Sequence, residues 1–211
     1  MSAEVTCPRC AAELRPPDAR SADWTCGEHG AVLPRRPSEQ PGQDALDEVL
    51  RHTHVPVWAP WPLPRDWLVT GFGSVGDERG GARAVAVALS GPGLLTGSHD
   101  LILVAEEPGI GLGAHFAGLP GTDPGPGFDR GAALTKLAAA GRSVPLWPVA
   151  APSDRAAYVG EALGNWLWAV LWPAEAGVLL LEASALLDLR EPGFALDLPY
   201  GPLSPRLTHL P

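Results

Sequence analysis

All three cysteines of the chain, Cys7, Cys10 and Cys26, lie within its first thirty residues, and His29 follows closely. The spacing is C-x2-C-x15-C-x2-H, in which two short chelating pairs are separated by a loop long enough to fold back. Thiolate and imidazole ligands in such a set suit a closed, tetrahedral Zn²⁺ site. The sequence therefore predicts that Cys7, Cys10, Cys26 and His29 bind a structural zinc ion.

Two other uses of these cysteines fit the sequence less well. A redox C-x-x-C motif needs a strand before it and a helix after it, and Pro8 and Pro16-Pro17 leave room for neither. Three cysteines cannot all pair in disulfides, and the sequence opens with no secretory signal pattern. We therefore expect reduced cysteines in a cytoplasmic protein.

The residues around the four predicted ligands resemble a zinc ribbon, with a Cys-Pro-x-Cys knuckle and a second knuckle that an aromatic residue precedes and a glycine closes. The matching residues are Cys7-Pro8-Arg9-Cys10, Leu14 and Trp24-Thr25-Cys26-Gly27-Glu28-His29-Gly30. Ala11 stands where the first knuckle usually has glycine, and His29 replaces the fourth cysteine. The whole chain also resembles an uncharacterised family of actinobacterial proteins with an N-terminal zinc ribbon, through 146–148 and 166–173. That resemblance implies a zinc ribbon and no particular activity.

The charge distribution disfavours nucleic acid and membranes as partners. The 211 residues carry a net charge of −9, and residues 1–40 hold five arginines against six acidic residues. A ribbon that grips nucleic acid needs a basic face, because phosphate neutralisation supplies most of the affinity. No apolar run approaches the roughly 18 residues that span a bilayer. A protein partner remains the favoured expectation, and the oligomeric state is open.

The rest of the chain predicts an α+β domain, mainly antiparallel, with a few helices. We expect a zinc ribbon over 1–33, a Pro-rich linker over 34–43 and the α+β domain over 44–211. An acidic start and an apolar stripe predict a helix over 44–51. A segment rich in Pro and Trp, 55–67, is expected to wrap the body or to dock on a partner. Alternating apolar residues predict strands over 67–72, 84–89 and 101–105.

The last third predicts further elements. A helix is expected over 132–140, capped by Asp129 and ended by Gly141. Three strands at hairpin spacing are expected over 158–163, 166–172 and 178–182, and 194–200 alternates like a final strand. In the middle strand, apolar residues occupy both faces, which is typical of the centre of a covered sheet. One buried helix over 158–171 is the alternative.

The sequence contains few motifs for chemistry outside the cysteine cluster. Gly71-Phe72-Gly73-Ser74-Val75-Gly76 matches G-x-G-x-x-G, but a strand rather than a helix follows it, which favours a hairpin over a dinucleotide site. The histidines at 52, 54, 99 and 115 are expected to be surface or structural residues.

The favoured function is therefore a non-catalytic zinc-binding protein that serves as a protein-interaction or regulatory module. One alternative is an enzyme or small-molecule binder in which the Gly-rich loop 109–131 covers a cleft near Glu106, Glu107, His115 and Asp129. The other is a zinc ribbon that binds nucleic acid.

Overall fold

The computed structural model describes residues 5–19, 21–38, 40–93, 97–182, 185–191, 193 and 196–208. It contains a two-stranded sheet near the N-terminus and one ten-stranded sheet. The strands are β1 (Thr25–Cys26), β2 (Gly30–Ala31), β3 (Arg35–Pro37), β4 (Trp58–Pro60), β5 (Leu68–Asp77), β6 (Gly81–Pro92), β7 (Ser98–Glu106), β8 (Thr135–Ala139), β9 (Arg142–Val149), β10 (Ala156–Ala162), β11 (Asn165–Trp172) and β12 (Ala185–Asp188). The helices are α1 (Gln43–His52), α2 (Leu112–Ala117), the 3₁₀ turn η1 (Ala174–Val178), α3 (Leu179–Glu182) and α4 (Pro205–Thr208).

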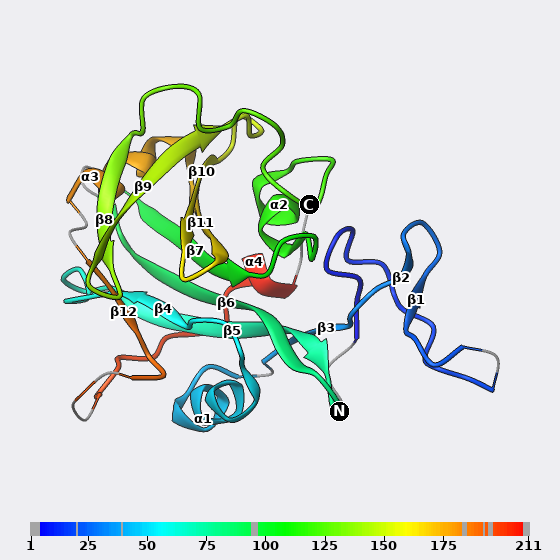
Figure 1. Ribbon diagram of the computed structural model, residues 1–211. Coiled ribbons are helices and arrows are strands. Elements are labelled where there is room, and N and C mark those ends of the chain that lie inside the picture. The colour runs from blue at the N-terminus through cyan, green and yellow to red at the C-terminus, as the bar shows by residue number, and fades with distance from the viewer. Residues whose placement is uncertain are drawn as a thin grey trace.

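The large sheet has the strand order β3-β5-β6-β7-β11-β10-β9-β8-β12-β4. All neighbours are antiparallel except β12 and β8, which are parallel. The sheet curls, so that β8, β12 and β4 return toward β5, β6 and β7 (Figure 1). The predicted α+β class with a mainly antiparallel sheet is confirmed.

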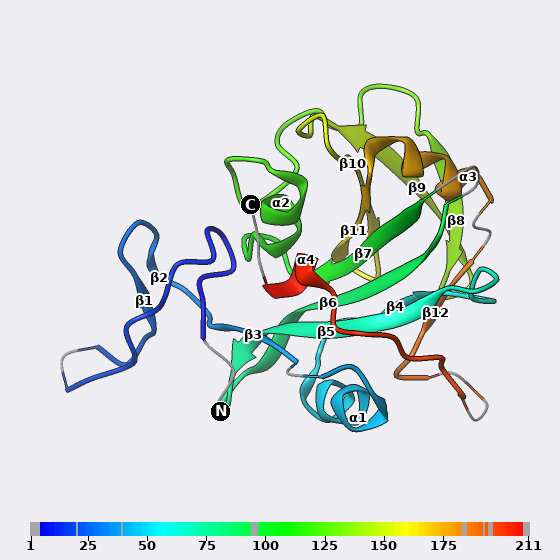
Figure 2. The same ribbon diagram turned by 180° about the vertical axis from the view of Figure 1, so that it is seen from behind.

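The curled sheet separates two hydrophobic cores. The inner core gathers apolar side chains from β4 through β12 and receives Leu46 of α1. The outer core lies on the opposite face, where α2 and α4 cover the sheet (Figure 2). Within the described residues, no helix is long and apolar enough to cross a membrane.

Strand β11 contributes to both cores. Leu167, Ala169 and Leu171 belong to the inner core, whereas Trp168, Val170 and Trp172 belong to the outer one. It pairs with β7 on one side and β10 on the other. The strand prediction for this segment is confirmed and the alternative of one buried helix is wrong, because a strand can bury two apolar faces at once in a covered sheet.

The prediction of a helix over 132–140 is wrong. Residues 135–139 form β8, in which Leu137 and Ala139 are buried while Lys136 and Ala138 are exposed. Ala140 and Gly141 both have positive φ, 48° and 71°, as the tight turn into β9 requires. Pairing with β9 and β12 therefore outweighs the helix propensity of the alanines.

The prediction of a strand over 178–182 is also wrong. The segment continues from η1 into α3. Ala176 and Leu180 are buried four residues apart, which places both on one helical face toward the inner core. A continuous apolar run fits both the two-residue period of a strand and the 3.6-residue period of a helix, so the sequence alone does not distinguish them.

The predicted final strand over 194–200 is not formed by its described residues. Phe194 lies outside the described part of the chain. Tyr200 makes an isolated bridge to Val69, and the Val69 N–H donates to the Pro199 carbonyl. The tail therefore runs along part of β5 without a regular ladder.

The segment 34–43, predicted as a linker, contains strand β3 at the edge of the large sheet. The Arg35 side chain is buried, donates a hydrogen bond to the Leu207 carbonyl of α4 and lies 5.4 Å above the ring of Phe116 in α2. Burial lowers the pKa of Arg35 to about 10. Because the segment is polar and rich in proline, its sequence predicted a linker and did not indicate these tertiary contacts.

Several predictions in the first half agree with the structure. The helix predicted over 44–51 is α1. The strands predicted over 84–89 and 101–105 lie within β6 and β7, and the one predicted over 67–72 begins one residue before β5. The G-x-G-x-x-G motif lies in β5, which turns into β6 as a hairpin. Trp58 and Trp67 of the Pro- and Trp-rich segment are buried, so this part wraps the body.

Candidate metal centre

The four predicted ligands come together in space. One ligand atom from each of Cys7, Cys10, Cys26 and His29 lies within 4.8 Å of the other three. The Sγ atoms of Cys10 and Cys26 are 3.7 Å apart, and the Nδ1 atom of His29 is 3.6 Å from Sγ of both Cys7 and Cys26. In the described part of the chain, no second group of His, Cys, Asp or Glu ligands assembles in this way.

These distances fit a tetrahedral metal. Zinc bonds of about 2.3 Å to sulfur and about 2.0–2.1 Å to nitrogen place sulfurs about 3.8 Å apart and sulfur about 3.6 Å from nitrogen. The separation of Cys10 and Cys26 is too long for a disulfide, whose sulfurs lie about 2.05 Å apart. The Cys3His cluster therefore has the geometry of a site for a metal such as zinc.

Two turns present the ligands. The first carries Cys7 and Cys10 and closes with a hydrogen bond from the Ala11 N–H to the Cys7 carbonyl. Ala11 adopts φ 57°, the left-handed conformation for which glycine is favoured. The second turn joins β1 to β2, pairs Cys26 with Gly30 and carries His29. The turn therefore forms with alanine at position 11, where zinc ribbons usually have glycine.

The two buried thiols of the cluster differ in how readily they ionise. Burial raises the pKa of the Cys7 thiol to about 12. Burial also opposes ionisation of Cys26, but hydrogen bonds from the N–H groups of Glu28 and His29, together with those of the His29 and Cys10 side chains, lower its pKa to about 6. A divalent metal stabilises buried thiolates, because a coordinating thiol loses its proton outright.

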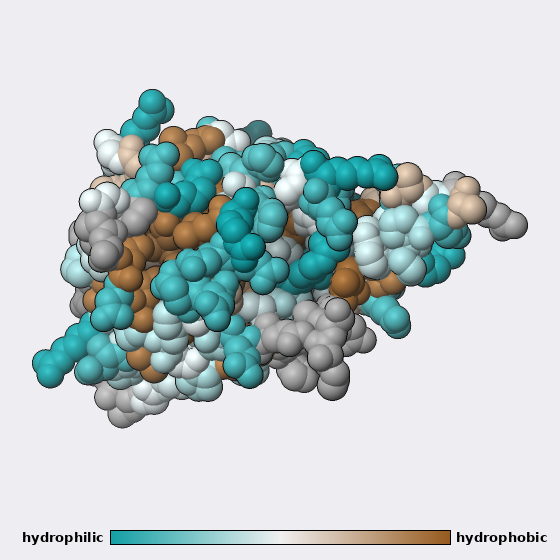
Figure 3. Space-filling model, turned by 90° about the horizontal axis from the view of Figure 1, so that it is seen from below, coloured by the Kyte–Doolittle hydropathy of each residue, from teal (hydrophilic) through white to brown (hydrophobic). Residues whose placement is uncertain are grey.

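The N-terminal segment (residues 5–19 and 21–33) projects from one side of the body (Figures 1 and 3) and contacts it through Arg9. The Arg9 guanidinium donates from Nη2 to the Gly109 carbonyl at 2.9 Å and from Nε to the Ile110 carbonyl at 3.2 Å. Arg9 lies between Cys7 and Cys10, so the turn that presents two ligands also holds the loop before α2. Sequence analysis missed this role, since only the position of Arg9 between two cysteines hinted at it.

We expect Arg9→Ala to release the 109–118 segment without removing the metal. Hydrogen bonds from a charged donor contribute about 1.5–3 kcal/mol, and about 1.4 kcal/mol is a tenfold change. Hydrogen exchange of amides in 109–118 should accelerate about tenfold while metal stoichiometry stays constant. Arg15→Ala, which removes an exposed arginine of the same segment, is the control. Unchanged exchange in Arg9→Ala would contradict this role.

Glu106 is buried under the loop predicted to cover a cleft. Its carboxyl oxygens accept hydrogen bonds from the N–H groups of Leu112 at 2.7 Å and Gly113 at 3.2 Å, at the start of α2. Burial is the largest effect on this group and raises its pKa to about 8. Glu106 therefore orders the start of α2.

The four side chains proposed for an enzymatic site do not converge. Glu106 is buried beneath α2, whereas Glu107 forms a surface ion pair with Arg83. Asp129 is exposed in the loop, and His115 is half-buried, with burial lowering its pKa to about 4. Of the described residues, these four line neither the cleft between α1 and the β5–β6 hairpin nor the pocket between the β8–β9 and β10–β11 turns. Nothing in this arrangement favours the enzymatic alternative.

We expect Glu106→Gln to flatten the dependence of stability on pH. The ordinary glutamate pKa is 4.5 and the folded value is about 8. Between these values the folded state keeps a proton that the unfolded state releases, so the wild-type free energy of unfolding falls as pH rises. The variant lacks this titration.

Denaturant unfolding at about pH 6 and about pH 8 measures the difference. The decrease in the free energy of unfolding from the lower to the higher pH should be smaller in Glu106→Gln than in wild type. In Glu107→Gln this decrease should equal that of wild type. Equal falls in all three proteins would show that Glu106 does not titrate in this range.

Taken together, the curled antiparallel sheet and the Cys3His cluster define an α+β protein with a candidate metal site in its N-terminal segment. The chain belongs to a family of unknown function, DUF6758, whose model matches residues 1–207. No curated protein and no solved structure matches the chain.

Proposed function

We propose that this protein is a non-catalytic zinc protein that acts as a protein-interaction or regulatory module. The observation that carries the proposal is the set of four protein ligands at tetrahedral separations. A catalytic zinc site keeps a position for water or substrate, whereas a four-ligand site is closed. The zinc therefore has a structural role.

The small apolar content of the N-terminal segment supports a structural zinc ion. Its core consists of Cys7, Leu14 and Cys26, with few partly buried residues around them. Metal binding supplies folding free energy to such small units. The zinc keeps the segment folded against the body, where Arg9 contacts the loop before α2.

The charge of the chain favours a protein over nucleic acid as the partner. The net charge is −9, and an acidic surface repels polyanions. A cytoplasmic protein with reduced cysteines is consistent with a zinc thiolate site. The unit that we propose to bind a partner comprises the body and the N-terminal segment that Arg9 holds against it.

Two measurements on the full chain test the proposal. Elemental analysis of the purified protein should find equimolar zinc. Cross-linking and affinity purification from the native host should recover a protein that binds again when both components are purified. Recovery of nucleic acid in a salt-sensitive complex, with no protein, would contradict the proposal and favour the nucleic-acid alternative.

A further inference from the structure

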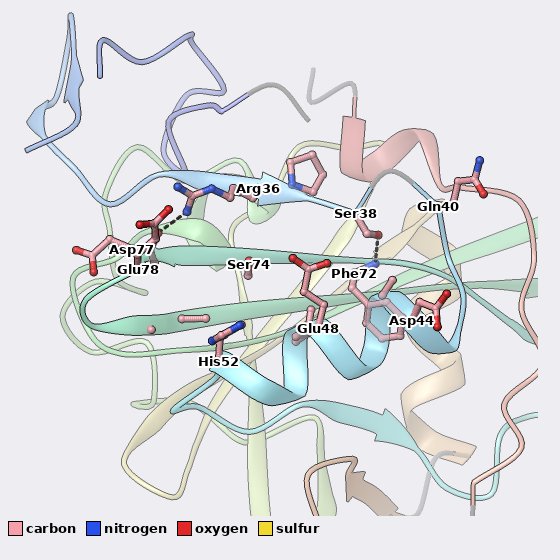
Figure 4. A pocket seen from close by; sticks show the side chains of 16 residues that line it. Arg36, Ser38, Gln40, Asp44, Glu48, His52, Phe72, Ser74, Asp77 and Glu78 are labelled. Carbon is pink, nitrogen blue, oxygen red and sulfur yellow. Dashed lines mark hydrogen bonds between the residues drawn. The ribbon is translucent and has the colours of Figure 1, made fainter. Parts of the chain in front are cut away.

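A cleft of about 650 Å³ lies between α1 and the β5–β6 hairpin, beside the edge strand β3 (Figure 4). It lies away from the Cys3His cluster and shares no lining residue with it. Ligand sites in proteins occupy about 300–1,000 Å³, so the cleft is large enough for one or two side chains of a partner.

The rim of the cleft is acidic. Four carboxylate residues from two separate elements line it: Asp44 and Glu48 of α1, and Asp77 and Glu78 at the end of β5. Glu48 extends from α1 toward β5, and Asp77 and Glu78 lie at the other end of the opening (Figure 4). N–H groups of Gly80 and Arg79 hold the pKa of Asp77 below its ordinary value.

The one basic residue other than histidine among the lining residues is already bound within the protein. Arg36 donates from Nη1 to the Gly76 carbonyl at 2.9 Å. It forms no ion pair with a rim carboxylate among the described residues, and its charge helps to lower the pKa of Asp77. The rim therefore keeps an excess of negative charge that a cationic group can neutralise.

Apolar side chains contribute to the lining of the cleft. They are Ala45 and Val49 of α1, Phe72 of β5 and Ala82 of β6, and the polar Ser74 of β5 lies among the lining residues as well. The face that contains α1, seen from below, shows apolar areas among hydrophilic side chains (Figure 3). Apolar side chains beside an acidic rim fit arginine and lysine, whose hydrocarbon stems pack on apolar surface while the charged head reaches the carboxylates.

The edge strand beside the cleft does not favour addition of another strand. β3 has only three residues, one of which is Pro37, which lacks an N–H donor. A partner is therefore recognised here through side chains rather than through a backbone ladder.

We infer that this cleft binds an arginine- or lysine-bearing segment of a protein partner. The inference rests on the proposed function as an interaction module, and it specifies the charge of the partner and the place of contact. A polyanion is excluded from the cleft by the same carboxylates.

A direct binding measurement tests the cleft. The probe is a fluorescein-labelled peptide, Gly-Arg-Leu-Arg-Gly, and its control has both arginines replaced by citrulline, which has a similar shape and no charge. The protein is the full-length, zinc-loaded chain, and the readout is fluorescence anisotropy. Glu48→Gln/Glu78→Gln removes two exposed carboxylates of the rim. Glu161→Gln/Glu191→Gln removes two exposed carboxylates elsewhere on the body.

The arginine peptide should bind the wild-type chain and the Glu161/Glu191 variant equally, and bind the Glu48/Glu78 variant about tenfold more weakly. The citrulline peptide should not bind, and salt should weaken the arginine complex. Equal binding to both variants, binding of the citrulline peptide, or no binding to wild type would each overturn the inference. Saturable binding of spermidine with none of the peptide would assign the cleft to a small cation instead.

The same variants separate this inference from the proposed function. A host protein that binds wild type and the Glu48/Glu78 variant equally would overturn the role of the cleft and leave the interaction function intact. Failure of the wild-type chain to bind any host protein would contradict the interaction function, whatever the peptide does.

Discussion

Replacing Cys26 with serine is expected to abolish stoichiometric zinc binding and to unfold the N-terminal segment. Cys26 is 2% exposed and its Sγ lies 3.7 Å from Cys10 and 3.6 Å from His29. Loss of one ligand opens a site whose zinc binding supplies about 10–16 kcal/mol in small zinc domains. Elemental analysis and limited proteolysis measure the two effects.

Two controls accompany Cys26→Ser. His29→Cys should retain zinc, because four cysteines also form a structural zinc site. Ser21→Ala changes an exposed residue of the same segment and should leave both readouts unchanged. Equimolar zinc together with a protease-resistant N-terminal segment in Cys26→Ser would refute the proposed site. The body should stay folded in every variant, because its two cores contain none of the four ligands.

Replacing Trp168 with alanine is expected to cause the largest loss of stability in the body. Trp168 is fully buried at the centre of β11 in the outer core. It packs so closely on α2 that a Cβ added at Gly113 would lie 2.1 Å from its ring. Loss of a buried tryptophan costs about 3–5 kcal/mol, which lowers the melting temperature of a chain of this size by roughly 10 °C.

Trp147→Ala is the matched control for Trp168→Ala. Trp147 is half-buried on β9, where it packs against Phe128 edge to face. Its loss should lower the melting temperature less, because part of its ring already contacts water. Differential scanning calorimetry with zinc present compares the two variants. Equal losses would contradict the expectation that Trp168 contributes more to the stability of the body than Trp147.

Much of the candidate site was predictable from the sequence because it is local. Cys7 and Cys10 lie on one turn, and Cys26 and His29 on another, so the spacing alone indicates two chelating pairs. Arg9 was not predicted, because its partners are the carbonyls of Gly109 and Ile110, a hundred residues away. The zinc identity stays a prediction, to be decided by the elemental analysis.

The secondary structure of the body was predictable where the spacing of apolar residues fits either a strand or a helix but not both. Strand β11 could be inferred from two apolar faces and its neighbouring turn. The 132–140 segment could not, because the alanines favour a helix locally while pairing with β9 and β12 holds them in a strand. The acidic cleft was missed as well, since its rim joins α1 to a hairpin about thirty residues further on.

The sequence by itself determined the Cys3His cluster, the antiparallel class of the body and the central position of β11, because these follow from residue spacing and apolar patterning. Only the tertiary structure decided that 34–43 contributes an edge strand, that Glu106 is buried at the start of α2 and that four carboxylates surround one cleft. The physical reason is that burial, pairing and the convergence of charge depend on contacts between residues distant in the chain, which local patterns do not encode.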